Sequence, residues 1–156
     1  STWPLHPERT AEAMRVEILS SGGAISTPRA LCGCDLCCQA RQRDVSYSRS
    51  GPSLFVHDPD LIFDTPEDII ASLARSRVER IEVGTYSHWH PDHLIRARMW
   101  ESLNGDYTGW PPTHQKTPLY FPRRVAEDVC DRLGMWEMFT FLSQSMNCLV
   151  GVHPSG

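Results

Sequence analysis

The stretch SHWHPDH, Ser87–His93, holds three of the seven histidines of the chain together with an aspartate. Neutral imidazole and carboxylate are the ligands that zinc and related divalent ions prefer in proteins. Four residues of these types within six positions are far more than an ordinary stretch contains. The alternative to a metal site is a polar loop in which Asp92 only caps a helix. We therefore predict a metal site formed by His88, His90, Asp92 and His93.

The spacing of these residues suits two adjacent metal ions. The preceding residues, 81–87 (IEVGTYS), are predicted to form a strand that leads directly to the first histidine. Alternate residues of a continuing strand would share one side, but the proline at position 91 ends that geometry and a turn there directs the last two ligands elsewhere. The predicted ligands are His88 and His90 for one ion, and Asp92 and His93 for the other.

The bulk composition is that of one ordinary globular domain. The chain has 156 residues, 40% of them hydrophobic, which is enough to bury a core. A net charge of −4 argues against nucleic-acid binding as the main function, and no apolar run approaches the roughly 20 residues of a membrane span. The N-terminus lacks the features of a signal peptide, so we expect a cytoplasmic location. We predict a flexible tail over residues 1–13 and one domain over 14–156.

Hydrophobic patterns and turn signals predict a mixed α/β fold in which helices cover the faces of a sheet. An Asp-Pro-Asp turn at 58–60 predicts a hairpin between the second and third strands. The segment 104–117 is predicted to be a loop. The predicted strands are 14–21, 53–58, 60–64, 81–87, 118–121 and 147–152, and the predicted helices are 35–43, 66–80, 91–103 and 122–134.

Three motifs together resemble those of the metallo-β-lactamase superfamily, whose metallohydrolases carry two metals in a shallow cleft. SHWHPDH resembles the superfamily signature, and DLIFDTPED (60–68) resembles its upstream strand-plus-aspartate motif. SSGGAISTPRALCGCDLC (20–37) resembles the glycine loop and C-x-C-x-x-C element of one branch. That branch includes the phosphoribosyl cyclic phosphate phosphodiesterase of the carbon–phosphorus lyase pathway and pyrroloquinoline quinone biosynthesis protein B. The complete H-x-H-x-D-H favours the phosphodiesterase side.

This resemblance implies a fold, a site and a reaction. The fold would be the N-terminal part of an αββα sandwich. Asp64 would stand beside the metals as a hydrogen-bonding carboxylate and would act with Asp92 in catalysis. The reaction would be metal-assisted hydrolysis of a small-molecule phosphodiester, such as a cyclic phosphate, by a hydroxide that bridges two zinc ions, with manganese as an alternative. Two alternatives stay open: hydrolysis of a thioester or lactam, and a non-catalytic zinc-binding partial chain.

A second metal site is predicted in CGCDLCC (32–38), which contains four of the six cysteines. These cysteines are too close together for a conventional disulfide framework, and such clusters in reducing compartments more often bind metals. Cys32, Cys34 and Cys37 would supply three thiolates to a structural, tetrahedral zinc. The resemblance implies a fourth ligand, a late histidine, that this sequence does not supply at a matching position. A reduced, metal-free thiol cluster is the alternative.

A count of ligands qualifies the predicted activity. The superfamily completes its dinuclear site with an aspartate and further histidines from the second half of the sandwich. The 156 residues contain no later aspartate-bearing strand and offer at best His153 as a further ligand. We therefore expect a C-terminally incomplete domain whose 156 residues alone are catalytically incompetent. A sheet left partly uncovered would also favour association, including a homo-oligomer.

Overall fold

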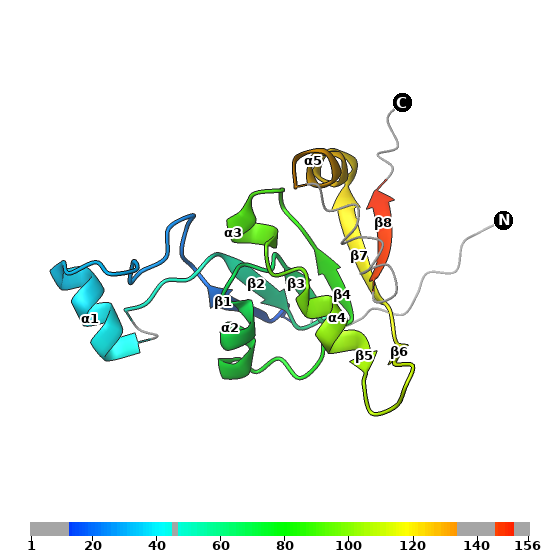
Figure 1. The fold of residues 1–156 in the computed structure, drawn as a ribbon, viewed down its shortest axis with the longest axis horizontal. Helices are drawn as coiled ribbons and strands as arrows, with labels where there is room; N and C mark the ends of the chain where they lie inside the picture. The colour runs from blue at the N-terminus through cyan, green and yellow to red at the C-terminus, as the bar shows by residue number, and fades with distance from the viewer. Residues whose placement is uncertain (1–12, 45–46, 134–145, 152–156) are drawn as a thin grey trace.

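Six strands form one mixed sheet in the computed structural model, which describes residues 13–44, 47–133 and 146–151. The order of the strands across this sheet is β1 (Val16–Ser20), β2 (Ser53–Val56), β3 (Leu61–Phe63), β4 (Val83–Thr85), β7 (Thr117–Pro122) and β8 (Met146–Gly151) (Figure 1). β1, β2 and β3 pair antiparallel, which confirms the predicted hairpin between β2 and β3. From β3 to β8 the neighbouring strands are parallel.

Parallel neighbours need crossover connections, and helices supply them. The connections are α2 (Ile69–Arg75) from β3 to β4, α3 (Pro91–Leu94) and α4 (Met99–Asn104) from β4 towards β7, and α5 (Arg123–Leu133) from β7 to β8. A further helix, α1 (Asp35–Arg43), lies between β1 and β2 in the chain. The predicted mixed α/β architecture is confirmed. In the described part of the chain, no helix combines the length and the apolar character that crossing a membrane requires.

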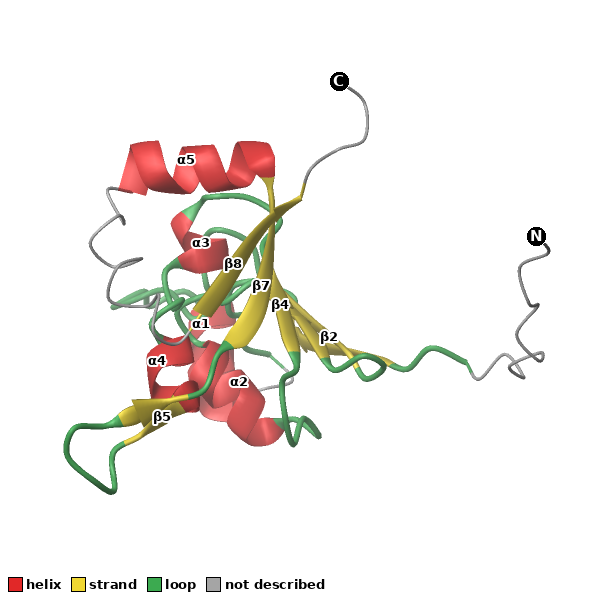
Figure 2. Ribbon diagram, turned by 90° about the vertical axis from the view of Figure 1, so that its right-hand side faces the viewer, coloured by secondary structure: helices red, strands yellow, loops and turns green. Residues whose placement is uncertain are grey.

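The core lies between the sheet and the helices α2 to α5, which occupy the same side of the sheet (Figure 2). Cross-strand register places Phe55, Ile62, Gly84 and Leu119 in one row on that side, because directly paired residues point to the same face. Trp100 of α4, fully buried, packs onto this row. A Cβ atom at Gly84 would lie 2.6 Å from the indole of Trp100, so only glycine allows β4 to pass so close beneath it.

The opposite face of the sheet carries apolar side chains that stay partly accessible. Ile18, Leu54, Phe63 and Tyr120 belong to one cross-strand row on that face, and Ile18 and Tyr120 are 70% and 47% exposed. No helix among the described residues lies over this face (Figure 2). Within the described residues, this apolar face of the sheet is thus left uncovered.

Several predicted elements differ from the observed ones. The helix predicted over 91–103 is broken into α3 and α4, and residues 95–98 form turns. The helix predicted over 66–80 is shorter, since α2 spans Ile69–Arg75. The predicted loop contains a small antiparallel pair, β5 (Gly105–Asp106) with β6 (Thr113–His114). Residues 1–12 of the predicted tail, and His153, lie outside the described residues.

Candidate metal centres

The junction between β4 and α3 gathers the three histidines of SHWHPDH. His90 is the N-cap of α3 with an extended backbone, and Pro91 occupies the first turn, where its missing N–H costs nothing. The short helix then turns His93 back towards the strand end. The His88 ring centre lies 3.9 Å from that of His93 and 4.6 Å from that of His90. The structure therefore brings together the imidazoles that the sequence singled out.

Asp64 lies beside these imidazoles as the central acceptor of a hydrogen-bond network. It directly follows β3, and because β3 and β4 are parallel neighbours, residues that follow them meet at one edge of the sheet. Its Oδ1 accepts the Ser87 backbone N–H at 2.8 Å, and its Oδ2 accepts the Ser87 hydroxyl at 2.7 Å and His93 Nδ1 at 2.8 Å. Asp64 is buried, and its backbone adopts a left-handed φ of 62°. The carboxylate lies in hydrogen-bond contact with the histidine cluster.

This network selects the tautomers of two histidines. A carboxylate only accepts hydrogen bonds, so His93 must carry its proton on Nδ1. The Ser87 hydroxyl gives its single proton to Asp64, so its oxygen accepts from His88 Nδ1 at 3.0 Å. Nε2 of both rings is then left with a lone pair, as metal ligation requires. Burial and the neighbouring imidazoles of His93 and His90 lower the pKa of His88, which keeps this ring neutral.

Ser87 is the member of this network that sequence analysis did not assign a role. Its signal was weak: a hydroxyl residue that directly precedes the first histidine of the motif. Its contribution depends on Asp64, which is 23 positions away in the chain and reaches it only through the pairing of β3 with β4.

Asp92 stands next to His93, with Oδ2 3.4 Å from Nε2 of that ring. This arrangement places together the two residues that were predicted to share an ion. The donor set of three imidazoles and a carboxylate fits zinc in its chemistry. Within the described residues, however, the group of three or more side chains that lies close enough to hold an ion is a cysteine cluster and not the histidine cluster.

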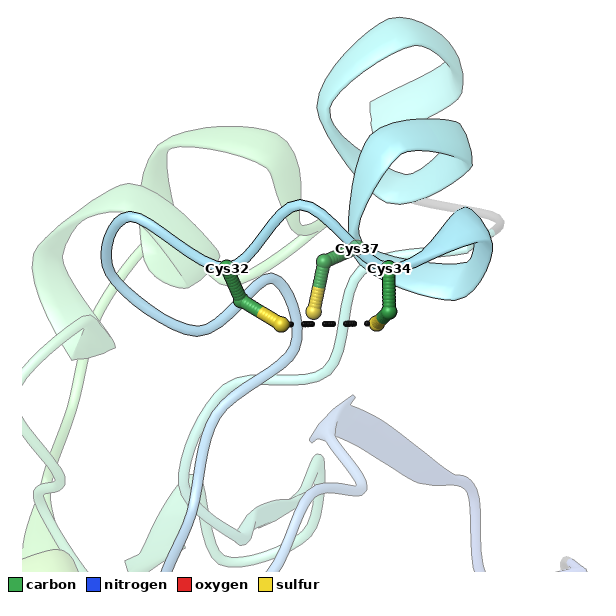
Figure 3. A group of neighbouring side chains, drawn as sticks. All are labelled: Cys32, Cys34 and Cys37. Carbon is green, nitrogen blue, oxygen red and sulfur yellow. Dashed lines mark hydrogen bonds between the residues drawn. The ribbon is translucent and has the colours of Figure 1, made fainter.

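The three predicted cysteine ligands form the tighter cluster (Figure 3). The Sγ atoms of Cys32, Cys34 and Cys37 all lie within 4.8 Å of one another, and those of Cys32 and Cys34 are 3.4 Å apart. Zn–S bonds of about 2.3 Å in tetrahedral geometry separate thiolates by about 3.8 Å, so the trio fits zinc with one position open. The cluster lies where the glycine-rich segment enters α1, away from α3 (Figure 1).

The surroundings of the cysteine cluster favour a thiolate. Hydrogen bonds from the Cys34 backbone, from the thiols of Cys34 and Cys37 and from Arg29 lower the pKa of Cys32 to about 6. The Arg29 guanidinium lies 3.1 Å from Cys32 Sγ. The Arg29 backbone N–H lowers the pKa of Cys37, but burial and the neighbouring thiols outweigh it and the pKa is raised. Cys38 lies outside the trio, and its thiol faces the Gly33 carbonyl at 3.5 Å.

Comparison with known proteins identifies the fold. No family model matches the chain, and a search of curated proteins finds no match. Several solved structures are similar to it. A diphosphatase from the PhnP family has a TM-score of 0.66 and 20% identity, and the match covers 88% of this chain and 51% of that one. Zn²⁺-bound PqqB from Methylobacterium extorquens has a TM-score of 0.61 and 18% identity, with coverage of 86% and 46%. The metallo-β-lactamase fold protein YhfI from Bacillus subtilis has a TM-score of 0.53 and 15% identity, with coverage of 92% and 46%. The chain spans about half the length of each. It therefore has the metallo-β-lactamase fold, as its sequence motifs predicted.

Proposed function

We propose that this chain belongs to a zinc-dependent hydrolase that cleaves a small-molecule phosphodiester at the histidine cluster. The observation that carries the proposal is the network in which Asp64 accepts from Nδ1 of His93 and the Ser87 oxygen accepts from Nδ1 of His88, so that Nε2 of each ring is the atom available to a metal. A network that orients imidazoles in this way is typical of metal sites, because it fixes both the tautomer and the ring plane of a ligand. The similarity to a diphosphatase and to a zinc-bound protein of the same fold supports the assignment.

Four residues would ligate the two ions and two others would orient the ligands. His88 and His90 would hold one ion, and Asp92 and His93 the other. Asp64 would not touch the ions but would orient His93 directly and His88 through Ser87. Two divalent ions, when bound, supply an activated water nucleophile and neutralise charge on the phosphoryl oxygens. Zinc is favoured by the donor set, and manganese is the alternative.

A phosphodiester is favoured over a thioester or lactam for a chemical reason. Two adjacent ions can hold the attacking and the leaving oxygens of an in-line displacement at the same time. One of the similar structures is a diphosphatase, which agrees with phosphate chemistry. The cysteine trio would bind a separate, structural zinc, because three thiolates gathered in a tight loop supply three of the four ligands of a tetrahedral site.

The test is the hydrolysis of bis(4-nitrophenyl) phosphate by the native protein that contains this chain, with zinc or manganese added or with a chelator. We expect turnover that requires metal and is abolished by His90→Ala. His114→Ala is the matched control, because it also removes an imidazole but from β6, where the ring faces Tyr107. Turnover that survives the chelator or His90→Ala would refute the proposal, and a preference for thioester or lactam substrates would replace its substrate class.

A further inference from the structure

Trp89, in the middle of the histidine motif, connects the cluster to a cation on a different helix. Its ring lies 4.7 Å from the His90 ring and nearly perpendicular to it, and its partly buried side chain packs against the core. The guanidinium carbon of Arg132 lies over the Trp89 ring, 5.1 Å from the ring centre. Arg132 belongs to α5, which runs beside α3 (Figures 1 and 2). The distance from the guanidinium carbon of Arg132 to the centre of the His90 ring is therefore at most the sum of the Arg132–Trp89 and Trp89–His90 distances.

Two contacts hold the Arg132 guanidinium in place. Nε donates to Asp128, one helical turn earlier, at 2.9 Å, and the face of the guanidinium rests on Trp89. Among the described residues, neither terminal nitrogen of Arg132 donates to a protein acceptor. The side chain is 53% exposed. As far as residues 13–44, 47–133 and 146–151 are concerned, Arg132 thus offers a pair of N–H donors beside Trp89 of the histidine motif.

The Arg132 guanidinium adds a positive charge beside the histidine motif. Ions held by the cluster would attract an anionic substrate, and this cation adds to that attraction. A planar guanidinium matches two oxygens of a phosphoryl group in a bidentate arrangement. We infer that Arg132 binds the anionic phosphoryl group of the substrate at the rim of the histidine cluster. The inference rests on the proposed function and deepens it by naming a residue that selects anionic substrates.

The same helix contains a matched control. Arg124 also pairs with Asp128, at 3.6 Å, and its side chain is 81% exposed. It lies eight residues before Arg132, about 12 Å along the helix axis, and is not the cation that stacks on Trp89. Arg124→Ala and Arg132→Ala therefore each remove one positive charge and one helical partner of Asp128. Only Arg132→Ala removes the cation that stands over the motif.

The experiment measures binding of diphenyl phosphate, an anionic probe, by isothermal titration calorimetry of the native protein in zinc-containing buffer. We expect Arg132→Ala to raise the Kd about tenfold, as the loss of a charge-assisted contact to a partly solvated phosphate does. Arg124→Ala should change the Kd less than twofold. Arg132→Lys should fall between them, because it keeps the charge and loses the planar fork. Binding of neutral triethyl phosphate should not respond to any of these substitutions.

The outcomes separate this inference from the proposed function. Equal effects of Arg132→Ala and Arg124→Ala, or no binding of diphenyl phosphate by the unaltered protein, would overturn the role of Arg132. If metal-dependent hydrolysis of bis(4-nitrophenyl) phosphate is found with an unchanged KM in Arg132→Ala, the hydrolase stands and the inference fails. If binding depends on Arg132 but no hydrolysis occurs, the anion site stands and the proposed function fails. Circular dichroism of each variant checks that the fold is intact.

Discussion

Replacing Asp64 with asparagine would separate the charge of this side chain from its shape. The backbone at this position has a φ of 62°, a left-handed conformation that asparagine adopts readily, so the turn after β3 should survive. The amide oxygen can still accept the Ser87 backbone N–H, as Oδ1 does now at 2.8 Å. The amide nitrogen, however, would replace the Oδ2 that accepts from both the Ser87 hydroxyl and His93.

The consequence for His93 follows from its tautomer. An amide N–H facing Nδ1 is best satisfied when that nitrogen accepts, which moves the ring proton to Nε2 and removes the lone pair a metal needs. Loss of such an orienting partner typically weakens metal binding about 10–100-fold, or about 1.4–2.7 kcal/mol. Asp64→Ala should have a similar effect on the metal and an additional cost to stability of about 1–2 kcal/mol, because alanine is disfavoured in the left-handed region.

The assay is a zinc titration against a chromophoric chelator in a Cys32→Ser/Cys34→Ser background, so that only the histidine cluster is measured. Asp68→Asn is the control, because it removes an exposed carboxylate from the N-terminus of α2. We expect Asp64→Asn to bind zinc at least tenfold more weakly than the Asp68→Asn control. A zinc affinity and a turnover rate that are both unaltered in Asp64→Asn would refute the orienting role.

Three further predictions concern the cysteine cluster, the carboxyl group of Asp128 in α5 and the activity of the isolated chain. Elemental analysis should show that Cys32→Ser/Cys34→Ser loses the structural zinc and keeps the other metal; a variant that keeps all its metal would disprove the cysteine site. Arg132 lowers the pKa of Asp128, so the stabilisation by this pair is present above the ordinary carboxyl range and is lost as pH falls through the lowered pKa. In an NMR pH titration, Arg132→Ala should raise that pKa. The 156 residues alone should not hydrolyse bis(4-nitrophenyl) phosphate, and robust turnover abolished by His90→Ala would contradict the count of ligands.

The sequence allowed the fold and the position of the histidine cluster to be predicted because both depend on local patterns. The residues of SHWHPDH are neighbours in the chain, and a proline after a strand forces the turn that gathers them. The cysteine trio is local in the same way. The place of Asp64 came from a family resemblance, since no spacing within the chain shows that β3 and β4 are parallel neighbours. The role of Ser87 required that pairing and was missed.

Helical periodicity also failed to predict the break between α3 and α4. Apolar residues from Leu94 to Leu103 recur at near-helical spacing, and a pattern of this kind reports only which side of a segment is buried. In the structure, the Arg96 N–H donates to the Thr65 carbonyl at 3.0 Å instead of continuing a helix. A long-range backbone hydrogen bond therefore competes with the local helix and ends it after one turn. The hydrophobic pattern of the sequence does not indicate a long-range backbone hydrogen bond of this kind.

The same interaction ties the site to the core. The Thr65 backbone N–H donates to the His93 carbonyl at 2.6 Å, so the residue after Asp64 holds the backbone of α3 while Asp64 holds its imidazole. The Thr65 hydroxyl meets the Tyr86 hydroxyl at 3.0 Å, and Trp100 Nε1 donates to that same hydroxyl at 2.8 Å. These buried side chains lie in the packed interior, where displacement is costly. The Arg96–Thr65 hydrogen bond that ends the helix thus belongs to the same contact through which Asp64 and Thr65, directly after β3, hold both the ring and the backbone of His93.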